Sequence, residues 1–185
     1  SLLLAFQFFT VLPVHKELPL TRSTITGMFA CLPWIGALMG TTVVGVLYSL
    51  TQWTASSEVM LAFIIIGLFA LWTGGLHLDG FIDMGDAYFS YRDRDKRLEI
   101  LDDPRVGAFG VLSILFLLFG KFVVLHELFV QNKFALWMVV FIPFLTRVGM
   151  SFYFMSLNCS KEKGLAYFFQ SHINAKLLKI IMLLS

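Results

Sequence analysis

Three aspartates with helical spacing stand out among the residues that could carry chemistry. They lie in the segment His77-x-Asp79-Gly-x-x-Asp83-x-x-Asp86. At about 100° per residue, positions 79, 83 and 86 fall within an arc of about 60° on one helical face. Like charges at these spacings destabilise a helix, so a countercharge is needed. Carboxylate oxygens suit a hard cation, and the pattern predicts a Mg²⁺ site formed by Asp79, Asp83 and Asp86.

Two alternatives accompany this prediction. An acidic helix face can simply be solvated, although the fixed spacing and the neighbouring glycines favour the metal site. His77 lies in the same turn but off the aspartate face. A lone histidine is more often a hydrogen-bonded structural residue than a ligand, so the spacing alone leaves a catalytic role for His77 open.

A second chemical feature follows in Asp102-Asp103-Pro104-Arg105-Val-Gly107-Ala-Phe-Gly110. Pro104 predicts that a helix ends after Asp103, and the two glycines predict where the next helix opens. A helix N-terminus offers free backbone N–H groups and a positive dipole end, and Arg105 adds a fork that fits phosphate. This segment therefore predicts a phosphate site, with helix capping alone as the alternative.

Two cations interrupt otherwise apolar runs, namely Lys121 and Arg147. A charge at bilayer depth costs at least about 2.5–3.5 kcal/mol, so its default interpretation is functional. Pro143, four residues before Arg147, can kink a helix and open a polar cavity. For Lys121 the alternatives are an ion pair with Glu127 or extension of the side chain to an interface.

The composition identifies the elements that must position these residues. Hydrophobic residues make up 58% of the 185 residues and charged residues 14%, against roughly 45–50% and 25% in soluble domains. This excludes soluble, fibrous and disordered classes and predicts an all-α polytopic integral membrane protein. A spanning helix needs about 20 apolar residues. At least four spans are expected, at Gly27–Leu50, Glu58–Thr73, Val106–Leu128 and Phe134–Leu157.

Two shorter apolar segments lie outside these spans. Leu2–Leu12 is too short to cross a bilayer, which predicts an interfacial or re-entrant N-terminal helix. Leu177–Leu184 begins a further apolar run within which the sequence stops, so we expect the protein to continue. We expect residues 1–185 to form a single membrane domain, with 77–105 as its acidic active-site loop.

The distribution of Lys and Arg predicts the orientation of the spans. The successive loops on one side carry two, five and four of these residues, whereas those on the other side carry none and one. The positive-inside rule then places the N-terminal segment, the 77–105 loop and the C-terminal segment in the cytoplasm. We therefore expect a multi-pass protein of the cell (inner) membrane whose active-site loop faces the cytoplasm.

Several segments, in order and with similar spacing, resemble the cobalamin synthase family, whose members are adenosylcobinamide-GDP ribazoletransferases. The resemblance runs to about residue 170 and is carried by Phe6–Val14, Thr73–Asp86, Arg97–Gly110, Lys121–Leu128, Thr146-Arg147 and Lys161–Leu165. The aspartate segment combined with the Asp-x-Arg-x-Gly segment is a specific pairing, since either half alone is weak. The sequence departs from the family pattern at Val11, Ala87, Pro104 and Thr146, and a late acidic motif of the family is absent.

The resemblance implies a Mg²⁺-dependent transfer of adenosylcobinamide phosphate from adenosylcobinamide-GDP to α-ribazole or its 5′-phosphate, with release of GMP. This is the final assembly stage of cobalamin (vitamin B12). It implies His77 and Asp103 as catalytic residues, the three aspartates as metal ligands, and Arg105, Lys121 and Arg147 as substrate-binding residues. Membrane lipid is the other expected partner, no nucleic acid is expected, and a homo-oligomer is left open.

Two other functions compete with this one. The aspartate spacing is similar to that of CDP-alcohol phosphotransferases of lipid synthesis, but their Asp-Gly-x-x-Ala-Arg signature corresponds here to Asp79-Gly-Phe-Ile-Asp83-Met. A transporter could also place Lys and Arg within spans. Against a transporter, the acidic cluster lies in a long loop and no inverted repeat is visible.

Overall fold

The chain is all-helical, as the sequence predicts. A computed structural model describes residues 1–54, 56–159 and 163–184, and within these it contains nine helices and no strand. The chain divides into two compact units. One comprises Ser1–Ser49 with Ala135–Ser185, and the other comprises Leu50–Phe134. That the chain forms a single membrane domain stays a prediction.

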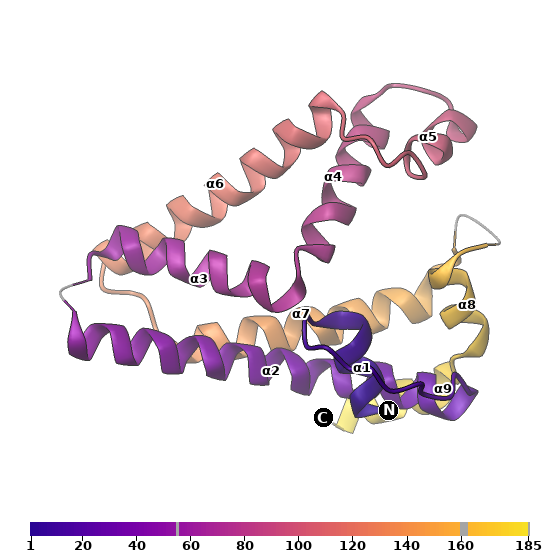
Figure 1. Ribbon diagram of the computed structural model, residues 1–185, viewed down its shortest axis with the longest axis horizontal. Helices are drawn as coiled ribbons and strands as arrows, with labels where there is room; N and C mark the ends of the chain where they lie inside the picture. The colour runs from indigo at the N-terminus through magenta and orange to yellow at the C-terminus, as the bar shows by residue number, and fades with distance from the viewer. Residues whose placement is uncertain (55, 160–162, 185) are drawn as a thin grey trace. The chain divides into compact units, whose positions relative to one another are not determined.

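The first unit is built on two long helices, α2 (Arg22–Trp53, whose last turn belongs to the second unit) and α7 (Leu136–Ser156). Three short helices complete it: α1 (Leu2–Phe9), α8 (Leu165–His172) and α9 (Ala175–Leu184) (Figure 1). The segment expected to be an N-terminal helix therefore forms one. The final apolar run lies in α9.

Close contact between α2 and α7 depends on two glycines four residues apart. A Cβ atom added at Gly36 would lie 2.8 Å from the carbonyl carbon of Pro143, and one added at Gly40 would lie 2.5 Å from the Cα of Val140. Small residues at this spacing let the backbones of membrane helices approach one another. The seam between α2 and α7 therefore has no room for a side chain at either position.

An aromatic cluster holds α8 against the same pair of helices. The ring of Phe29 on α2 stacks on Phe154 of α7, with centroids 4.8 Å apart, and meets Phe169 of α8 edge-on at 6.1 Å. Phe8 of α1 also packs edge-on against Phe169, at 5.1 Å. The side-chain amide of Gln170 donates to the carbonyl oxygen of Phe154, at 2.9 Å.

The second unit contains α3 (Glu58–Thr73), α4 (Leu76–Phe89), α5 (Arg94–Ile100) and α6 (Ala108–Val130). The chain bends by 93° between α3 and α4. Figure 1 shows α6 running back from the end of α4 toward the start of α3, so that α3, α4 and α6 form three sides of a triangle. One part of α6 therefore packs on α4 and another on α3.

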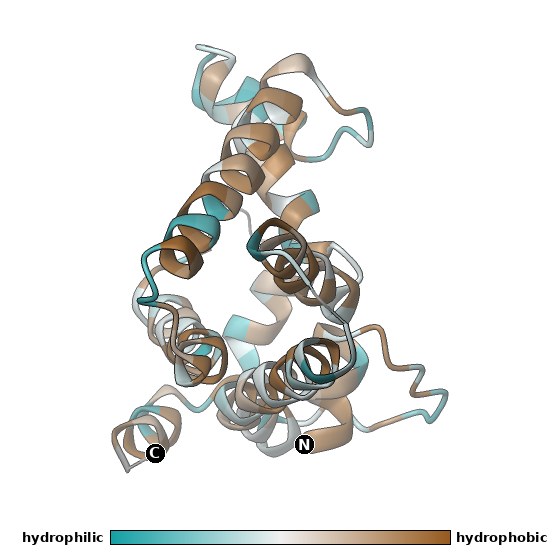
Figure 2. Cartoon of the chain, turned by 90° about the vertical axis from the view of Figure 1, so that its left-hand side faces the viewer, coloured by the Kyte–Doolittle hydropathy of each residue, from teal (hydrophilic) through white to brown (hydrophobic). Residues whose placement is uncertain are grey.

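Candidate membrane spans occur where the hydropathy predicts them. Among the described residues α2, α6 and α7 are each long and apolar enough to cross a bilayer, and the bent pair of α3 and α4 would make a fourth. The predicted span Glu58–Thr73 coincides with α3, but alone it is too short. Figure 2 shows hydrophobic residues along most of the long helices and hydrophilic residues mainly in the connections. The chain therefore has the character of a multi-pass membrane protein.

We predict that Gly36→Ala and Gly40→Ala each destabilise the first unit by about 1–3 kcal/mol, because the new methyl group would overlap the backbone of α7. Gly45→Ala is the matched control, since a Cβ at Gly45 meets nothing within 4 Å and alanine is favoured in a helix. Thermal unfolding in lipid nanodiscs measures the effect. Equal melting temperatures for all three variants would contradict the role assigned to the seam.

Candidate active site

The acidic helix begins directly after a glycine turn. Gly74 and Gly75 adopt left-handed backbone angles, with φ of 61° and 76°, a conformation that side-chain-bearing residues adopt only at a cost. This turn ends α3 and starts α4, which carries the predicted aspartates. Along α4 Asp79 is exposed, Asp83 is half-buried and Asp86 is buried.

The carboxylate of Asp86 binds the N-terminus of α6. It accepts hydrogen bonds from the backbone N–H groups of Gly107 and Gly110, both at 2.7 Å. These groups have no partner within the helix, and the positive end of the helix dipole favours a negative charge beside them. Asp86 therefore occupies backbone donors that the sequence analysis assigned to a phosphate.

Small residues bring α4 and α6 close enough for this bond. A Cβ atom at Gly85 would lie 2.5 Å from the Oγ of Ser113, and one at Gly107 would lie 2.8 Å from the carboxyl carbon of Asp86. A Cβ at Gly110 would in turn meet Ile82 at 2.7 Å. Glycine at these three positions is thus a condition for the contact. The sequence features that could have indicated this close contact are the pair Gly107 and Gly110 and, in the helix that carries the aspartates, Gly85.

The structure therefore separates Asp86 from the other two aspartates. Among the described residues no group of three or more His, Cys, Asp or Glu side chains is placed to hold a metal ion. Asp79 and Asp83 lie one turn apart on α4, whereas the bond to α6 is made by Asp86. Two carboxylates fit Mg²⁺, which commonly takes one or two of them together with substrate phosphates. Mg²⁺ binding by these aspartates stays a prediction.

His77 lies in the first turn of α4 and is held by a residue of α3. Its Nδ1 is 2.8 Å from the hydroxyl oxygen of Thr73. Thr73 is buried, and the glycine turn brings the first turn of α4 back over it. The sequence signal for this partner is the position of Thr73 four residues before His77.

Asp103 and Arg105 form an ion pair in the connection between α5 and α6. The carboxylate accepts from the Nε of Arg105 at 3.0 Å, from a terminal nitrogen at 2.7 Å and from the Arg105 backbone N–H at 3.0 Å. These hydrogen bonds lower the pKa of Asp103 to about 2 and raise the pKa of Arg105. At neutral pH Asp103 is thus a poor proton acceptor, and its geometry suits holding the guanidinium of Arg105 in place.

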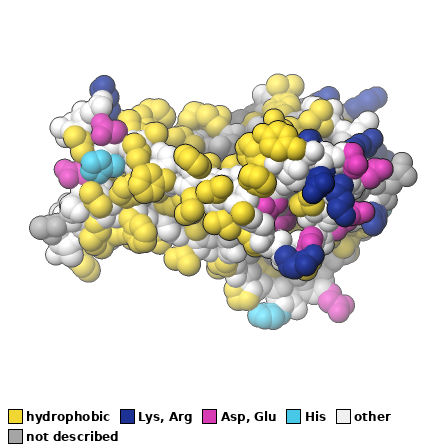
Figure 3. Space-filling view, turned by 90° about the horizontal axis from the view of Figure 1, so that it is seen from above, with side chains coloured by type: hydrophobic (Ala, Val, Ile, Leu, Met, Phe, Trp, Pro, Cys, Tyr) yellow, Lys and Arg dark blue, Asp and Glu magenta, His cyan; other side chains and the backbone are white. Residues whose placement is uncertain are grey.

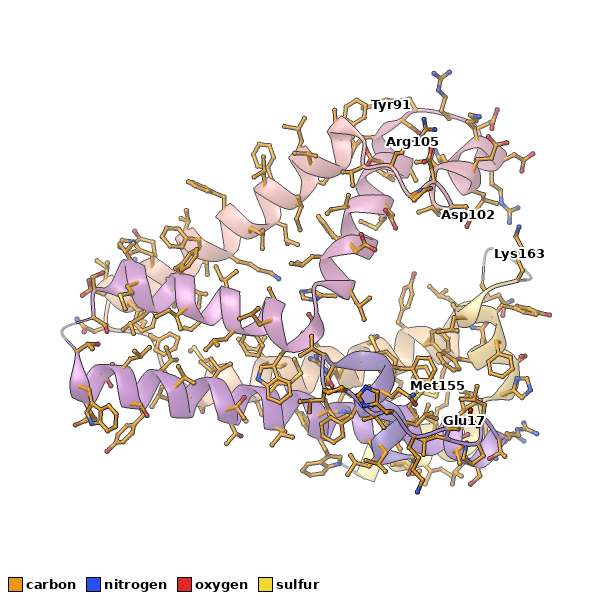
Figure 4. The ribbon with its side chains drawn as sticks, viewed as in Figure 1. Glu17, Tyr91, Asp102, Arg105, Met155 and Lys163 are labelled. Carbon is orange, nitrogen blue, oxygen red and sulfur yellow. The ribbon has the colours of Figure 1, made fainter. Side chains whose placement is uncertain are left out.

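The connection around this pair is strongly charged. Figure 4 shows Arg105 and Asp102 in the segment that leads into α6. In Figure 3, Lys, Arg, Asp and Glu side chains are most frequent on the right of the view, and hydrophobic side chains are more frequent over the rest of it. The prediction that a helix continues to Asp103 is wrong, because α5 ends at Ile100 and residues 101–103 form a turn before Pro104.

The two predicted intramembrane cations belong to different units. Lys121 is exposed on α6, 14 residues after Gly107, which corresponds to about 21 Å at 1.5 Å per residue. Arg147 belongs to the first unit, where one guanidinium nitrogen lies 3.1 Å from the sulfur of Met39 and another 3.4 Å from the Pro143 carbonyl oxygen. The polar cavity predicted near Arg147 from Pro143 stays a prediction.

The chain matches one family of known proteins over its whole length. The family model described as cobalamin-5-phosphate synthase matches residues 1–185. An adenosylcobinamide-GDP ribazoletransferase of Geobacillus sp. (strain WCH70) is 35% identical over 170 residues, which cover 92% of this chain and 64% of the relative. One of Clostridium botulinum (strain Eklund 17B / Type B) is 32% identical over 184 residues, covering 100% and 71%. No solved structure matches the chain.

The chain spans only part of the curated relatives it resembles. For the Geobacillus sp. protein, and for the enzyme of the same name from Geobacillus kaustophilus (strain HTA426), it covers 64% and 62% of the relative's length. The regions that these proteins share with the chain include the segment from α3 to α6, which carries the features described above.

We predict that Asp86→Ala lowers the free energy of unfolding by about 3 kcal/mol, because two charge-assisted hydrogen bonds are lost and two backbone N–H groups are left without an acceptor. Asp79→Ala is the matched control, since Asp79 is exposed on the same helix. Thermal unfolding in nanodiscs compares the two variants. If both variants unfold at the wild-type temperature, the bond to α6 does not hold the unit together.

Proposed function

Because the chain belongs to the cobalamin-5-phosphate synthase family, we propose that the protein transfers adenosylcobinamide phosphate from adenosylcobinamide-GDP to α-ribazole or its 5′-phosphate. The observation that carries the proposal is the match of the family model to all 185 residues. The names of the relatives support the same reaction. The acidic helix gives this reaction a chemical basis.

The reaction is a phosphoryl transfer that needs charge neutralisation and positioning more than covalent help. A ribose hydroxyl oxygen of the acceptor attacks the phosphorus that bears the cobinamide, and a new P–O bond forms. The P–O bond to the GMP phosphate breaks, and GMP leaves with the electron pair. The hydroxyl proton passes to a base, so that atoms and charge balance.

Asp79 and Asp83 would hold Mg²⁺ in this proposal. The ion would neutralise charge on the pyrophosphate. Asp79 is exposed and Asp83 is half-buried on α4. Asp86 contributes by fixing α4 to α6, since both of its oxygens accept from backbone N–H groups.

His77 is the base that the contacts favour. Its ring is fixed by Thr73 at the start of the acidic helix, whereas the pKa of Asp103 is lowered to about 2 by Arg105. Asp103 therefore acts through Arg105, whose remaining N–H groups would bind phosphate oxygens. Lys121 and Arg147 are further proposed phosphate-binding residues because each is a cation within an apolar helix.

The orientation of the protein is also part of the proposal. The loops with many Lys and Arg residues, including the connection from α4 to α6, would face the cytoplasm. Nucleotide-activated substrates are cytoplasmic, which agrees with this orientation. Membrane lipid would then surround the long apolar helices α2, α6 and α7.

The direct test is release of GMP by the purified protein in nanodiscs with adenosylcobinamide-GDP, α-ribazole and Mg²⁺. We expect GMP release that needs both substrates, that stops when EDTA removes divalent cations and that is lost in Asp83→Asn. An amide oxygen lacks the charge that a carboxylate gives a hard cation. Wild-type protein that releases no GMP would contradict the proposal. Release of CMP from a CDP-activated lipid alcohol instead would favour the CDP-alcohol phosphotransferase.

A further inference from the structure

The contact between Thr73 and His77 determines more than the position of the ring. The hydroxyl oxygen of Thr73 lies 2.8 Å from His77 Nδ1, and also 3.2 Å from each of the carbonyl oxygens of Phe69 and Ala70. A hydroxyl group has one proton to donate. That proton therefore goes either to a carbonyl oxygen of α3 or to the imidazole ring.

Other hydroxyl groups on the helices show which acceptor such a group usually takes. Thr26, Thr41 and Ser156 each donate to the carbonyl oxygen four residues earlier, at 2.7, 2.8 and 2.7 Å. Thr73 is within reach of the equivalent oxygen, that of Phe69. Serine and threonine side chains commonly bond in this way to the preceding turn.

A hydroxyl that donates to its own helix must be an acceptor toward the ring. We propose that Thr73 is a positioning residue, which accepts a hydrogen bond from His77 Nδ1–H and so leaves the lone pair of the neutral ring on Nε2. The hydrogen bond made by one ring nitrogen determines whether the other ring nitrogen carries a proton. This inference rests on the proposed role of His77 as the base. It assigns the basic atom as Nε2.

The contact is made across the glycine turn. Residues four apart are neighbours on a straight helix, and here the pair keeps its contact although the chain bends by 93° between α3 and α4. Thr73 is buried, so its hydroxyl keeps its partners in the protein. A valine at this position has nearly the same shape and lacks the hydroxyl.

The test is ¹⁵N NMR of the full chain in nanodiscs, with labelled histidine and at a pH at which the His77 ring is neutral. His77→Gln identifies the His77 signals among the four histidines. We expect a protonated Nδ1 and an unprotonated Nε2 in wild type and Thr73→Ser, and a mixture of both tautomers in Thr73→Val. Thr41→Val is the control, since the Thr41 hydroxyl donates to the Ala37 carbonyl oxygen within α2, and it should leave the signals unchanged.

Turnover provides a second measurement. Thr73→Val should lower kcat about 10- to 100-fold, no more than the roughly 10²- to 10⁴-fold that a positioned base contributes, with KM unchanged and activity restored in Thr73→Ser. A wild-type ring protonated on Nε2, or an unchanged spectrum in Thr73→Val, would overturn the proposal. Because the spectra need no substrate, the assignment of Nε2 can hold even if the protein fails to release GMP.

Discussion

The bond between the Asp86 carboxylate and the N-terminus of α6 is the interaction on which the acidic site depends. Asp86 is buried, and both of its oxygens accept from backbone N–H groups at 2.7 Å. It joins a helix that carries acidic residues to the start of a long apolar helix. Without it, α4 would keep the glycine turn at its start but lose its hydrogen bonds to the start of α6.

The bond has geometric conditions that extend along both helices. Gly85, Gly107 and Gly110 have no room for a Cβ atom, because the two backbones lie too close together. In the seam between α2 and α7, Gly36 and Gly40 likewise allow the two backbones to lie close together. In lipid, where burial of apolar surface between helices gains little, close backbone contact and polar bonds are what hold helices together.

The sequence predicted the helices well because hydropathy and bilayer thickness constrain them strongly. Glu58–Thr73 matched α3, and three longer runs matched α2, α6 and α7 within a few residues at each end. The role of Asp86 could not be predicted, because helical spacing places it on one face with Asp79 and Asp83 and does not show what that face contacts. The bond spans 21 to 24 residues, and a spacing rule reaches only within one helix. The pairing of Thr73 with His77 matches the four-residue spacing of neighbours on a helix, although it is made across the turn at Gly74 and Gly75.

The central claim is that Asp83 belongs to a cation site, whereas Asp86, three residues later, is a structural joint. Electron paramagnetic resonance of free Mn²⁺, titrated with the protein in nanodiscs, separates these roles without any turnover. We predict that Asp83→Asn weakens Mn²⁺ binding by about tenfold or more. Asp86→Asn should leave the affinity nearly unchanged in protein that is still folded, because the amide oxygen can still accept one of the two backbone hydrogen bonds that join α4 to α6. Loss of Mn²⁺ binding in Asp86→Asn, with wild-type affinity in Asp83→Asn, would contradict it.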